Sequence, residues 1–268
     1  MAADSIYAQK LWLKSYEKGV PENVQFEELT MPDYLDKAVK DFPDSTAMVF
    51  VGHKLTYRQF QDQVNRFATC LTGFGIKKGD AVAILLPNSI PCVVAYYAIL
   101  KIGAIVVLNN PLYSDPELNH QFNDSESKAL ITMDALANRM IDLRPKTKIK
   151  QIVYMRIGDY LNPIKRFIAY KTKKLAYTEV KAAADVYQWK DCLAQYQPNP
   201  PTVKLTLDDV AMYQYTGGTT GVSKGVVLTH GNLSKQVQQI NAWFPSFGRG
   251  HEVMLGALPY FHVFGMSC

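Results

Sequence analysis

The chain has 268 residues, of which 48% are apolar and 20% are charged. This length fits one large core or two small ones, and the composition excludes wholesale disorder. The net charge of +5, from 29 basic and 24 acidic residues, is too small by itself to indicate a nucleic-acid-binding protein.

The four cysteines lie far apart and have no metal-ligand spacing. We therefore expect reduced thiols in a cytoplasmic protein rather than a disulfide scaffold. No continuous apolar segment follows Asp4, so no signal peptide is predicted. The most apolar stretch, 93–108, is interrupted by Lys101 and Gly103 and indicates a buried helix and strand rather than a membrane span.

Helix and strand patterns alternate along the first 155 residues. Thr30 followed by Pro32 predicts the start of a helix, and a hairpin with its turn at Gly52-His53 follows it. The next apolar residues recur at spacings of three and four from Tyr57 to Leu71, which predicts a helix with one buried face. We then expect strands over 81–86, 105–108, 129–132 and 151–154, and helices from 89 to 100, over 117–122 and over 135–143. This alternation predicts an α/β fold of wound, mostly parallel β-sheets with flanking helices.

The alternation is interrupted from 156 to about 196, and a Pro-rich stretch at 198–201 indicates a linker. Strands over 210–215 and 225–228, a helix from Leu233 to Phe244 and a last apolar strand over 253–258 are expected after it. We expect a first βα subdomain over 1–155, a basic insert and linker over 156–201, and the start of a second subdomain over 202–268. Because no polar tail follows Gly265, we expect the chain to be the N-terminal part of a longer protein that has a separate C-terminal domain.

A loop rich in glycine and threonine lies between the two strands expected over 210–215 and 225–228. Glycines let backbone N–H groups converge on an anion, threonine hydroxyls add donors, and a lysine adds positive charge, so the loop suits a triphosphate. Its spacing matches neither a Walker A loop nor a dinucleotide-binding GxGxxG turn. The predicted phosphate-binding residues are Thr216, Gly217, Gly218, Thr219, Thr220, Gly221, Val222, Ser223 and Lys224.

This loop resembles the phosphate loop of the adenylate-forming superfamily, which includes acyl-CoA synthetases, luciferases and adenylation domains of peptide synthetases. Ser223 stands where the family most often has proline. Further blocks in family order extend the resemblance over nearly the whole chain: Leu55-Thr56-Tyr57, Gly79 to Ala83, Leu86-Pro87-Asn88 and Asn109 to Tyr113.

Two segments favour a fatty acid as the substrate. The segment Trp12 to Pro21 resembles the leader of bacterial long-chain fatty acyl-CoA ligases. The segment Leu258 to Gly265 resembles the block that borders the acyl tunnel in the family, and its aromatic and small residues suit an alkyl chain.

His262 is the candidate catalytic histidine, because a neutral imidazole can hydrogen bond near the reacting carboxylate. A packing or gating role that touches the substrate without acid–base work is the favoured alternative. His230, at the start of the helix after the loop, is expected to cap that helix or to face solvent. His53 and His120 give no site signal.

The insert over 161–178 contains five basic residues and no acidic one, with apolar residues between them. This pattern suits a surface that contacts anionic lipid, from which a fatty acid would arrive, and equally suits a solvated basic helix. No nucleic-acid recognition module is found, and the oligomeric state, a homodimer included, stays open. The basic residues are Lys165, Arg166, Lys171, Lys173 and Lys174.

The resemblance implies ATP, Mg²⁺ and coenzyme A as cofactor and co-substrates, with Thr216 as a candidate magnesium ligand. A fatty acid carboxylate would form an acyl-adenylate, from which coenzyme A displaces AMP. The alternatives are a ligase for an aryl or medium-chain acid, an enzyme that stops at the adenylate, and a non-catalytic membrane- or partner-binding remnant. The family's adenine segment, magnesium-binding glutamate, ribose-binding aspartate and C-terminal lysine are expected beyond Cys268, so we expect the 268 residues alone to make no acyl-CoA.

Overall fold

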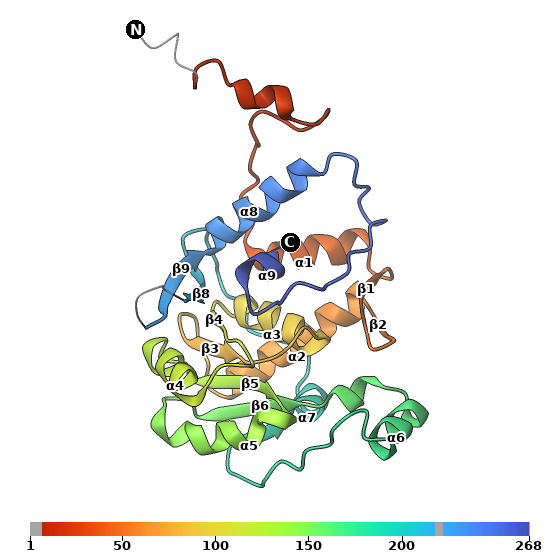
Figure 1. Cartoon of the computed structure of the whole chain (residues 1–268), viewed down its shortest axis with the longest axis vertical. Coiled ribbons are helices and arrows are strands. Elements are labelled where there is room, and N and C mark those ends of the chain that lie inside the picture. Colours follow the sequence, from red (N-terminus) through yellow and green to blue (C-terminus); the bar gives the residue numbers. More distant parts are fainter. Residues whose placement is uncertain (1–6, 218–221, 268) are drawn as a thin grey trace.

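Short strands form one large sheet, and its central strands are runs of buried apolar residues (Figure 1). The structure, a computed structural model, describes residues 7–217 and 222–267. The strands are β3 (Ala81–Ile84), β4 (Ile105–Leu108), β5 (Ala129–Met133), β6 (Gln151–Met155), β7 (Val186–Gln188), β8 (Val210–Thr216) and β9 (Lys224–Thr229). Their order is β7-β6-β5-β3-β4-β8-β9, and all neighbours are parallel except the antiparallel pair β8 and β9. The predicted α/β fold with a mostly parallel sheet is confirmed.

The central strands are buried on both faces of the sheet, as expected for a parallel sheet covered by helices. In β3, Val82 and Ile84 belong to one apolar cluster, whereas Ala81 and Ala83 belong to the other. Because successive side chains of a strand point to opposite faces, this alternation divides the core into two layers.

Helices cover both of these layers. The first cluster includes residues of α1 (Met31–Asp41), α2 (Tyr57–Gly73), α3 (Ile90–Lys101), α7 (Trp189–Gln195) and α8 (His230–Trp243), and the second includes residues of α4 (Asp115–Asp124) and α5 (Asp134–Leu143). The remaining elements are the hairpin strands β1 (Thr46–Phe50) and β2 (His53–Thr56), α6 (Pro163–Lys171), α9 (Val263–Ser267) and the short helices η1 (Leu11–Ser15), η2 (Arg144–Lys146) and η3 (Ile157–Tyr160). None of the helices in the described part of the chain is both long and apolar enough to cross a membrane.

Two predicted helix starts are confirmed. Thr30 precedes α1, and its backbone N–H donates to the carboxylate of Asp33 at 2.7 Å. Ser89 precedes α3 and accepts a hydrogen bond from the backbone N–H of Cys92. These bonds satisfy backbone and side-chain groups that a helix terminus otherwise leaves unpaired.

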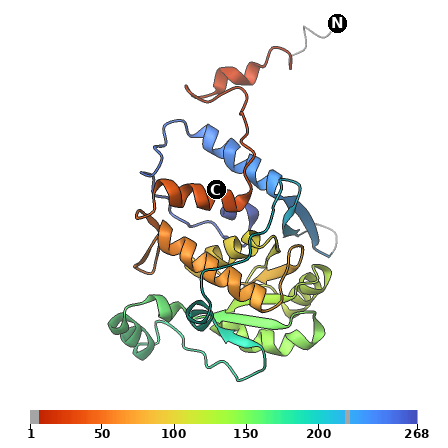
Figure 2. The ribbon, with the colours of Figure 1, turned by 180° about the vertical axis from the view of Figure 1, so that it is seen from behind.

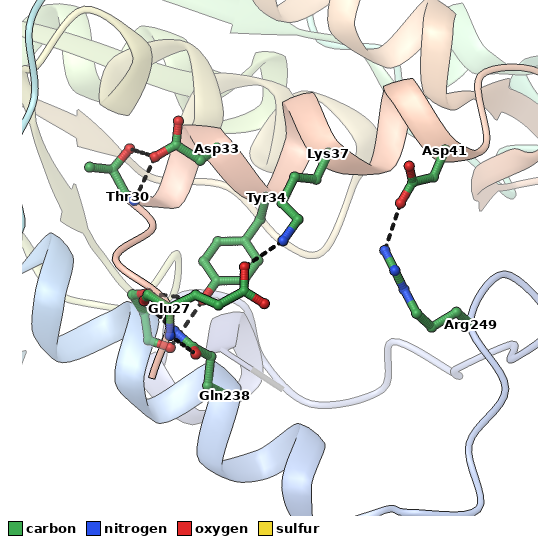
Figure 3. Close-up of polar contacts among 9 residues, drawn as sticks. Glu27, Thr30, Asp33, Tyr34, Lys37, Asp41, Gln238 and Arg249 are labelled. Carbon is green, nitrogen blue, oxygen red and sulfur yellow. Dashed lines mark hydrogen bonds and ion pairs between the residues drawn. The ribbon is translucent and has the colours of Figure 1, made fainter. Parts of the chain in front are cut away.

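Helix α8 is tied to α1 by polar contacts that join distant parts of the chain (Figure 3). The backbone N–H of Glu27 donates to Gln238 at 2.8 Å, and Lys37 on α1 donates to the carboxylate of Glu27 at 2.6 Å. Arg249 pairs with Asp41 at 2.7 Å. These contacts hold α8, which follows the candidate phosphate loop, against the first residues of the fold.

The hairpin turn lies one residue earlier than predicted, at Val51-Gly52. Both residues have positive φ, 46° and 87°, which is the requirement of a tight type I′ hairpin turn. The placement at Gly52-His53 was wrong because the turn needs two consecutive left-handed residues, and only the second of them is glycine.

The predicted interruption between 156 and 196 is partly wrong. This stretch contains α6, β7 and α7, and β7 extends the parallel sheet beside β6. The strand has only three residues and α7 only seven, so neither is long enough for a clear periodic signal.

The predicted strand over 253–258 is also wrong. The segment has no regular structure, and Val253 and Leu255 are 95% and 90% exposed. An apolar run becomes a strand only when a neighbouring strand takes its hydrogen bonds, and none of the described strands pairs with it.

Strands from both proposed subdomains lie in the same sheet. β3 to β6 come from residues 1–155, whereas β8 and β9 come from residues 202–268, and β4 pairs directly with β8. The proposed subdomain boundaries remain predictions.

Candidate functional site

The candidate phosphate loop joins the two strands of the β8–β9 hairpin. Thr216 is the last residue of β8, Lys224 is the first residue of β9, and the two are partners in the hairpin register. Thr216, with its hydroxyl, therefore lies opposite Lys224, with its ammonium group, at the base of the loop. Both residues are exposed. Gly217, Val222 and Ser223 lie between them. Gly218, Thr219, Thr220 and Gly221 lie outside the described residues.

The hairpin places this loop at the carboxyl edge of the parallel strands. Met212 and Gln214 of β8 are in register with Val106 and Leu108 of β4, so the two parallel strands end side by side. In open α/β sheets, ligands bind at the carboxyl ends of the strands. The position of the loop therefore matches its predicted chemistry.

Helix α4 supports the loop from one side. Nε2 of His120 lies 2.9 Å from the carbonyl oxygen of Ser223, and because that oxygen only accepts, this nitrogen carries the proton. Gln121 donates from Nε2 to the Ser223 hydroxyl at 3.3 Å, and Asn109, after β4, donates to Oε1 of Gln121 at 2.6 Å. Sequence reasoning assigned no role to His120 or Gln121, because neither a motif nor a spacing links α4 to a residue about 100 positions later.

Tyr215 anchors the hairpin to the end of α4. Its hydroxyl donates to the carboxylate of Asp124 at 2.6 Å. Burial, together with Asp124, raises the pKa of Tyr215, so the phenol stays protonated and keeps donating. A Cβ added at Gly225 would lie 3.1 Å from Cζ of the Tyr215 ring, so glycine there leaves room for the ring.

A cavity of ≈ 500 Å³ lies beside this anchor, lined in part by Asp80, Asp124, Glu126, Lys128 and Tyr215. Three of these side chains are carboxylates and one is a cation. This excess of negative charge would repel a triphosphate, so the loop and not the cavity is the candidate phosphate site.

A second segment reaches the same edge of the sheet. Asn88, beyond the end of β3, donates to the carbonyl oxygens of Gly256 and Leu258 at 2.8 and 2.7 Å and accepts from the backbone N–H of Tyr260 at 2.8 Å. Gln214 of β8 donates to the carbonyl oxygen of Phe261 at 3.3 Å. The ends of β3 and β8 therefore hold the 256–261 segment close to the loop.

His262, the predicted catalytic residue, is exposed and follows this held segment. Its Nδ1 accepts a hydrogen bond from the backbone N–H of Phe264 at 3.3 Å, and its own backbone N–H donates to Pro259. The imidazole therefore has one local hydrogen bond, through Nδ1, and its Nε2 has no hydrogen-bond partner among the described residues.

The expectation for His230 was wrong. His230 is fully buried, Thr229 caps α8, and Nδ1 of His230 accepts from the backbone N–H of Met31 at 3.2 Å. The residue joins α8 to α1, and only the packing of two elements 199 positions apart reveals this.

Two buried side-chain oxygens near the loop, Oδ1 of Asn109 and Oε1 of Gln214, have no hydrogen-bond partner among the described residues. Both atoms are shielded from solvent, and each could accept only from an N–H or O–H donor. Thr216 and Lys224, exposed at the base of the loop, offer a hydroxyl and an ammonium that can donate to phosphate oxygens, which fits the phosphates of a nucleotide. The described part contains no cluster of three or more His, Cys, Asp or Glu side chains that could hold a metal ion.

The fold and this edge define an α/β protein with a glycine- and threonine-rich hairpin at the carboxyl ends of parallel strands. The model of the AMP-binding enzyme family matches residues 35–268, and the chain belongs to this family.

The chain is similar to long-chain-fatty-acid–CoA ligases of bacteria. It is 35% identical over 264 residues to the ligase of Bacillus subtilis (strain 168) and 34% identical over 267 residues to that of Escherichia coli O157:H7. Each match covers 97% of this chain and 47% of the relative, so the chain spans about half the length of these curated relatives.

Solved structures agree on the fold. A long-chain-fatty-acid-CoA ligase from Archaeoglobus fulgidus matches with a TM-score of 0.74 and 25% identity, covering 94% of this chain and 47% of that one. ATP-bound MatB from Rhodopseudomonas palustris matches with a TM-score of 0.71 and 22% identity, covering 90% and 42%.

Proposed function

We propose that this chain forms the phosphate-binding part of a ligase that activates a long-chain fatty acid with ATP and transfers it to coenzyme A. The observation that carries the proposal is the pairing of Thr216 with Lys224 at the base of the loop, at the carboxyl edge of the sheet. The 35% identity to a long-chain-fatty-acid–CoA ligase supports the choice of acid.

In the proposed reaction, a carboxylate oxygen attacks the α-phosphorus of ATP and pyrophosphate leaves. The thiolate of coenzyme A then attacks the acyl carbon and AMP leaves with the bonding electrons. Lys224 and the Thr216 hydroxyl bind and orient phosphate oxygens, which lowers the cost of bringing an anionic acid to an anionic nucleotide. Magnesium, when bound, neutralises phosphate charge, and Thr216 is its proposed ligand from this chain.

Nucleotide binding by the 268-residue chain tests the phosphate site. We expect Lys224→Gln to weaken ATP binding by about 10- to 100-fold, because a charge-assisted hydrogen bond is lost, and Thr216→Val by about tenfold. Isothermal titration with ATP measures this, and Lys235→Gln, at an exposed lysine of α8, is the matched control. Equal affinities for all four proteins would refute the assignment.

We propose that His262 borders the acid, with a packing or gating role as the alternative to hydrogen bonding with the carboxylate. Its exposure next to the segment held by Asn88 supports a substrate-facing position. Titration with palmitate checks this: His262→Ala should weaken palmitate binding and leave ATP binding unchanged, and unchanged palmitate binding would remove His262 from the site.

A ligase for an aryl or medium-chain acid is the second candidate. Competition between palmitate, octanoate and benzoate for the same chain separates the two. We also propose that the enzyme works in the cytoplasm at the inner face of an anionic membrane, where long-chain fatty acids are concentrated.

A further inference from the structure

Helix α6 is oriented by a tyrosine on its inner face. Arg166, Ala169 and Tyr170, at i, i+3 and i+4, are the less exposed residues of the helix. The Tyr170 ring packs edge-on against Tyr177 with centroids 5.5 Å apart. Its hydroxyl lies so close to Gly158 that a Cβ there would be 2.0 Å away, so this side of α6 is seated on the fold.

The outer face of α6 is apolar and unpartnered. Ile164, Phe167 and Ile168, again at i, i+3 and i+4, are 73%, 66% and 52% exposed, and α6 has no buried residue. A surface helix normally turns its apolar stripe toward the core. Here the stripe faces away from it, which marks an interaction surface.

Basic residues surround this stripe. Lys165, Lys173 and Lys174 are exposed, and no carboxylate of the described residues lies within 4.0 Å of their ammonium groups. Lys171 lies 5.8 Å from the centre of the Phe167 ring, at the end of the same face. Arg166 reaches Asp159 at 3.9 Å, and the whole stretch 161–178 contains no acidic residue.

The tip of the β1–β2 hairpin lies beside α6. Phe50 and His53 both contact the ring of Tyr160, with centroids 5.6 Å apart, and Tyr160 stands three residues before α6. Figures 1 and 2 show the hairpin and α6 on the same side of the molecule, whereas α8 and the β8–β9 hairpin lie away from them.

This hairpin tip also presents apolar side chains to solvent. Val49 and Val51 are 61% and 41% exposed. Val51 has φ 46°, a left-handed conformation that is costly for a β-branched residue and easy for asparagine or glycine. An exposed valine at such a position opposes both backbone preference and solvation, and such outliers point to a function.

We propose that the outer face of α6 and the hairpin tip dock the protein on a lipid bilayer containing anionic phospholipids. Ile164, Phe167, Ile168 and Val51 enter the headgroup region, and the lysines bind lipid phosphates. A second copy of the same surface does not fit, because its lysines would face these lysines without any carboxylate between them. The proposal extends the proposed function. It rests on that function only in taking a fatty acid as the substrate that the membrane supplies.

Co-sedimentation of the 268-residue chain with vesicles tests the surface. We expect binding to vesicles of phosphatidylcholine with 30% phosphatidylglycerol, weakened by salt, and at least tenfold weaker binding to phosphatidylcholine alone. Phe167→Ser with Ile168→Ser should lower the affinity about tenfold, and Lys165→Glu with Lys173→Glu and Lys174→Glu about 100-fold or more.

Two matched control variants replace similar numbers of apolar or basic side chains outside the proposed docking surface. Val253→Ser with Leu255→Ser and the triple change Lys146→Glu, Lys150→Glu and Lys235→Glu alter other exposed residues and should retain binding within a factor of three. Equal losses in controls and test variants, or binding of the unchanged chain to neither vesicle, would overturn the proposal. The assay contains neither ATP nor coenzyme A, so its result is independent of whether the chain belongs to an active ligase.

The variant Val51→Asn separates docking from folding. Asparagine accepts the left-handed backbone, so the variant should unfold at a higher temperature than the unchanged chain. It should bind the anionic vesicles about three- to fivefold more weakly, because an apolar contact is lost. Unchanged binding with raised stability would exclude the hairpin tip from the docking surface.

Discussion

His230 carries a proton-linked contact between two distant helices. Its Nδ1 accepts from the backbone N–H of Met31, so the neutral imidazole carries its proton on Nε2, which has no partner among the described residues. Burial lowers the pKa of His230 below its ordinary value of 6.5. The folded protein therefore resists protonation of this residue.

The sign of the resulting pH dependence follows from linkage. Well above pH 6.5, the imidazole is almost entirely neutral in both states and its titration costs almost no stability. As the pH falls from 6.5 toward the lowered folded-state pKa, the unfolded chain takes up a proton that the folded chain refuses, and the free energy of unfolding decreases. We expect His230→Asn, which keeps an acceptor near Nδ1 but cannot titrate, to reduce the loss of stability between pH 7.5 and 5.5.

Urea unfolding at the two pH values measures this difference. His53→Asn, at an exposed histidine of the β1–β2 hairpin, is the matched control and should leave the pH dependence of the parent unchanged. The account is wrong if His230→Asn loses as much stability on acidification as the unchanged chain does.

At the scale of elements, single asparagines bind irregular segments to the ordered part of the fold. Asn88 makes three hydrogen bonds to backbone groups of the 256–260 segment at one end of the fold. Asn138 of α5 makes two comparable bonds, to the carbonyl oxygen of Glu179 and the backbone N–H of Lys181, both at 2.9 Å. Segments without regular structure depend on such bonds because no neighbouring strand or helical turn pairs with their backbone groups.

We expect Asn88→Ala to release the 256–260 segment and to cost about 1–3 kcal/mol of stability, because three hydrogen bonds worth about 0.5–1.5 kcal/mol each are lost. Hydrogen exchange followed by mass spectrometry should show faster exchange in the peptide that contains Tyr260. The matched change Asn138→Ala should instead speed exchange at 179–181, and faster exchange of both segments in both variants would indicate a general loosening.

Local patterns predicted most elements and missed those that depend on neighbours. Strands β3 to β6 and β8 to β9 were predictable because their apolar runs are bounded by clear breaks, and Thr30 and Ser89 mark helix starts by their chemistry. The three-residue β7 was not predictable, because it is a strand only through its hydrogen bonds with β6.

At the scale of the whole molecule, the sheet gathers residues from four regions of the chain at one edge. The ends of β3, β4 and β8 contribute Asn88, Asn109 and Thr216, and α4 contributes His120. Helix α6 follows β6 and precedes β7 in the chain, and these two strands lie at the margin of the sheet opposite β8 and β9. The proposed membrane surface and the candidate phosphate site are therefore separate.

Because these 268 residues correspond to about half of the similar ligases, we expect them to bind ATP but not to support ATP–pyrophosphate exchange with palmitate. Exchange of labelled pyrophosphate into ATP by the purified chain measures this, with Lys224→Gln as the control for contaminating activity. Exchange above background that the Lys224→Gln variant loses would show that the 268 residues suffice for adenylate formation.

The sequence by itself determined the alternation of strands and helices and the composition of the loop from Thr216 to Lys224. Both depend only on the types of residues that lie close together in the chain. Only the tertiary structure decided that the 253–258 run is no strand, that His230 is buried, and that His120 and Asn88 reach the site. The physical reason is that hydrogen bonding and burial depend on partners that are far away in the chain, and their positions are set by how strands and helices pack into one sheet.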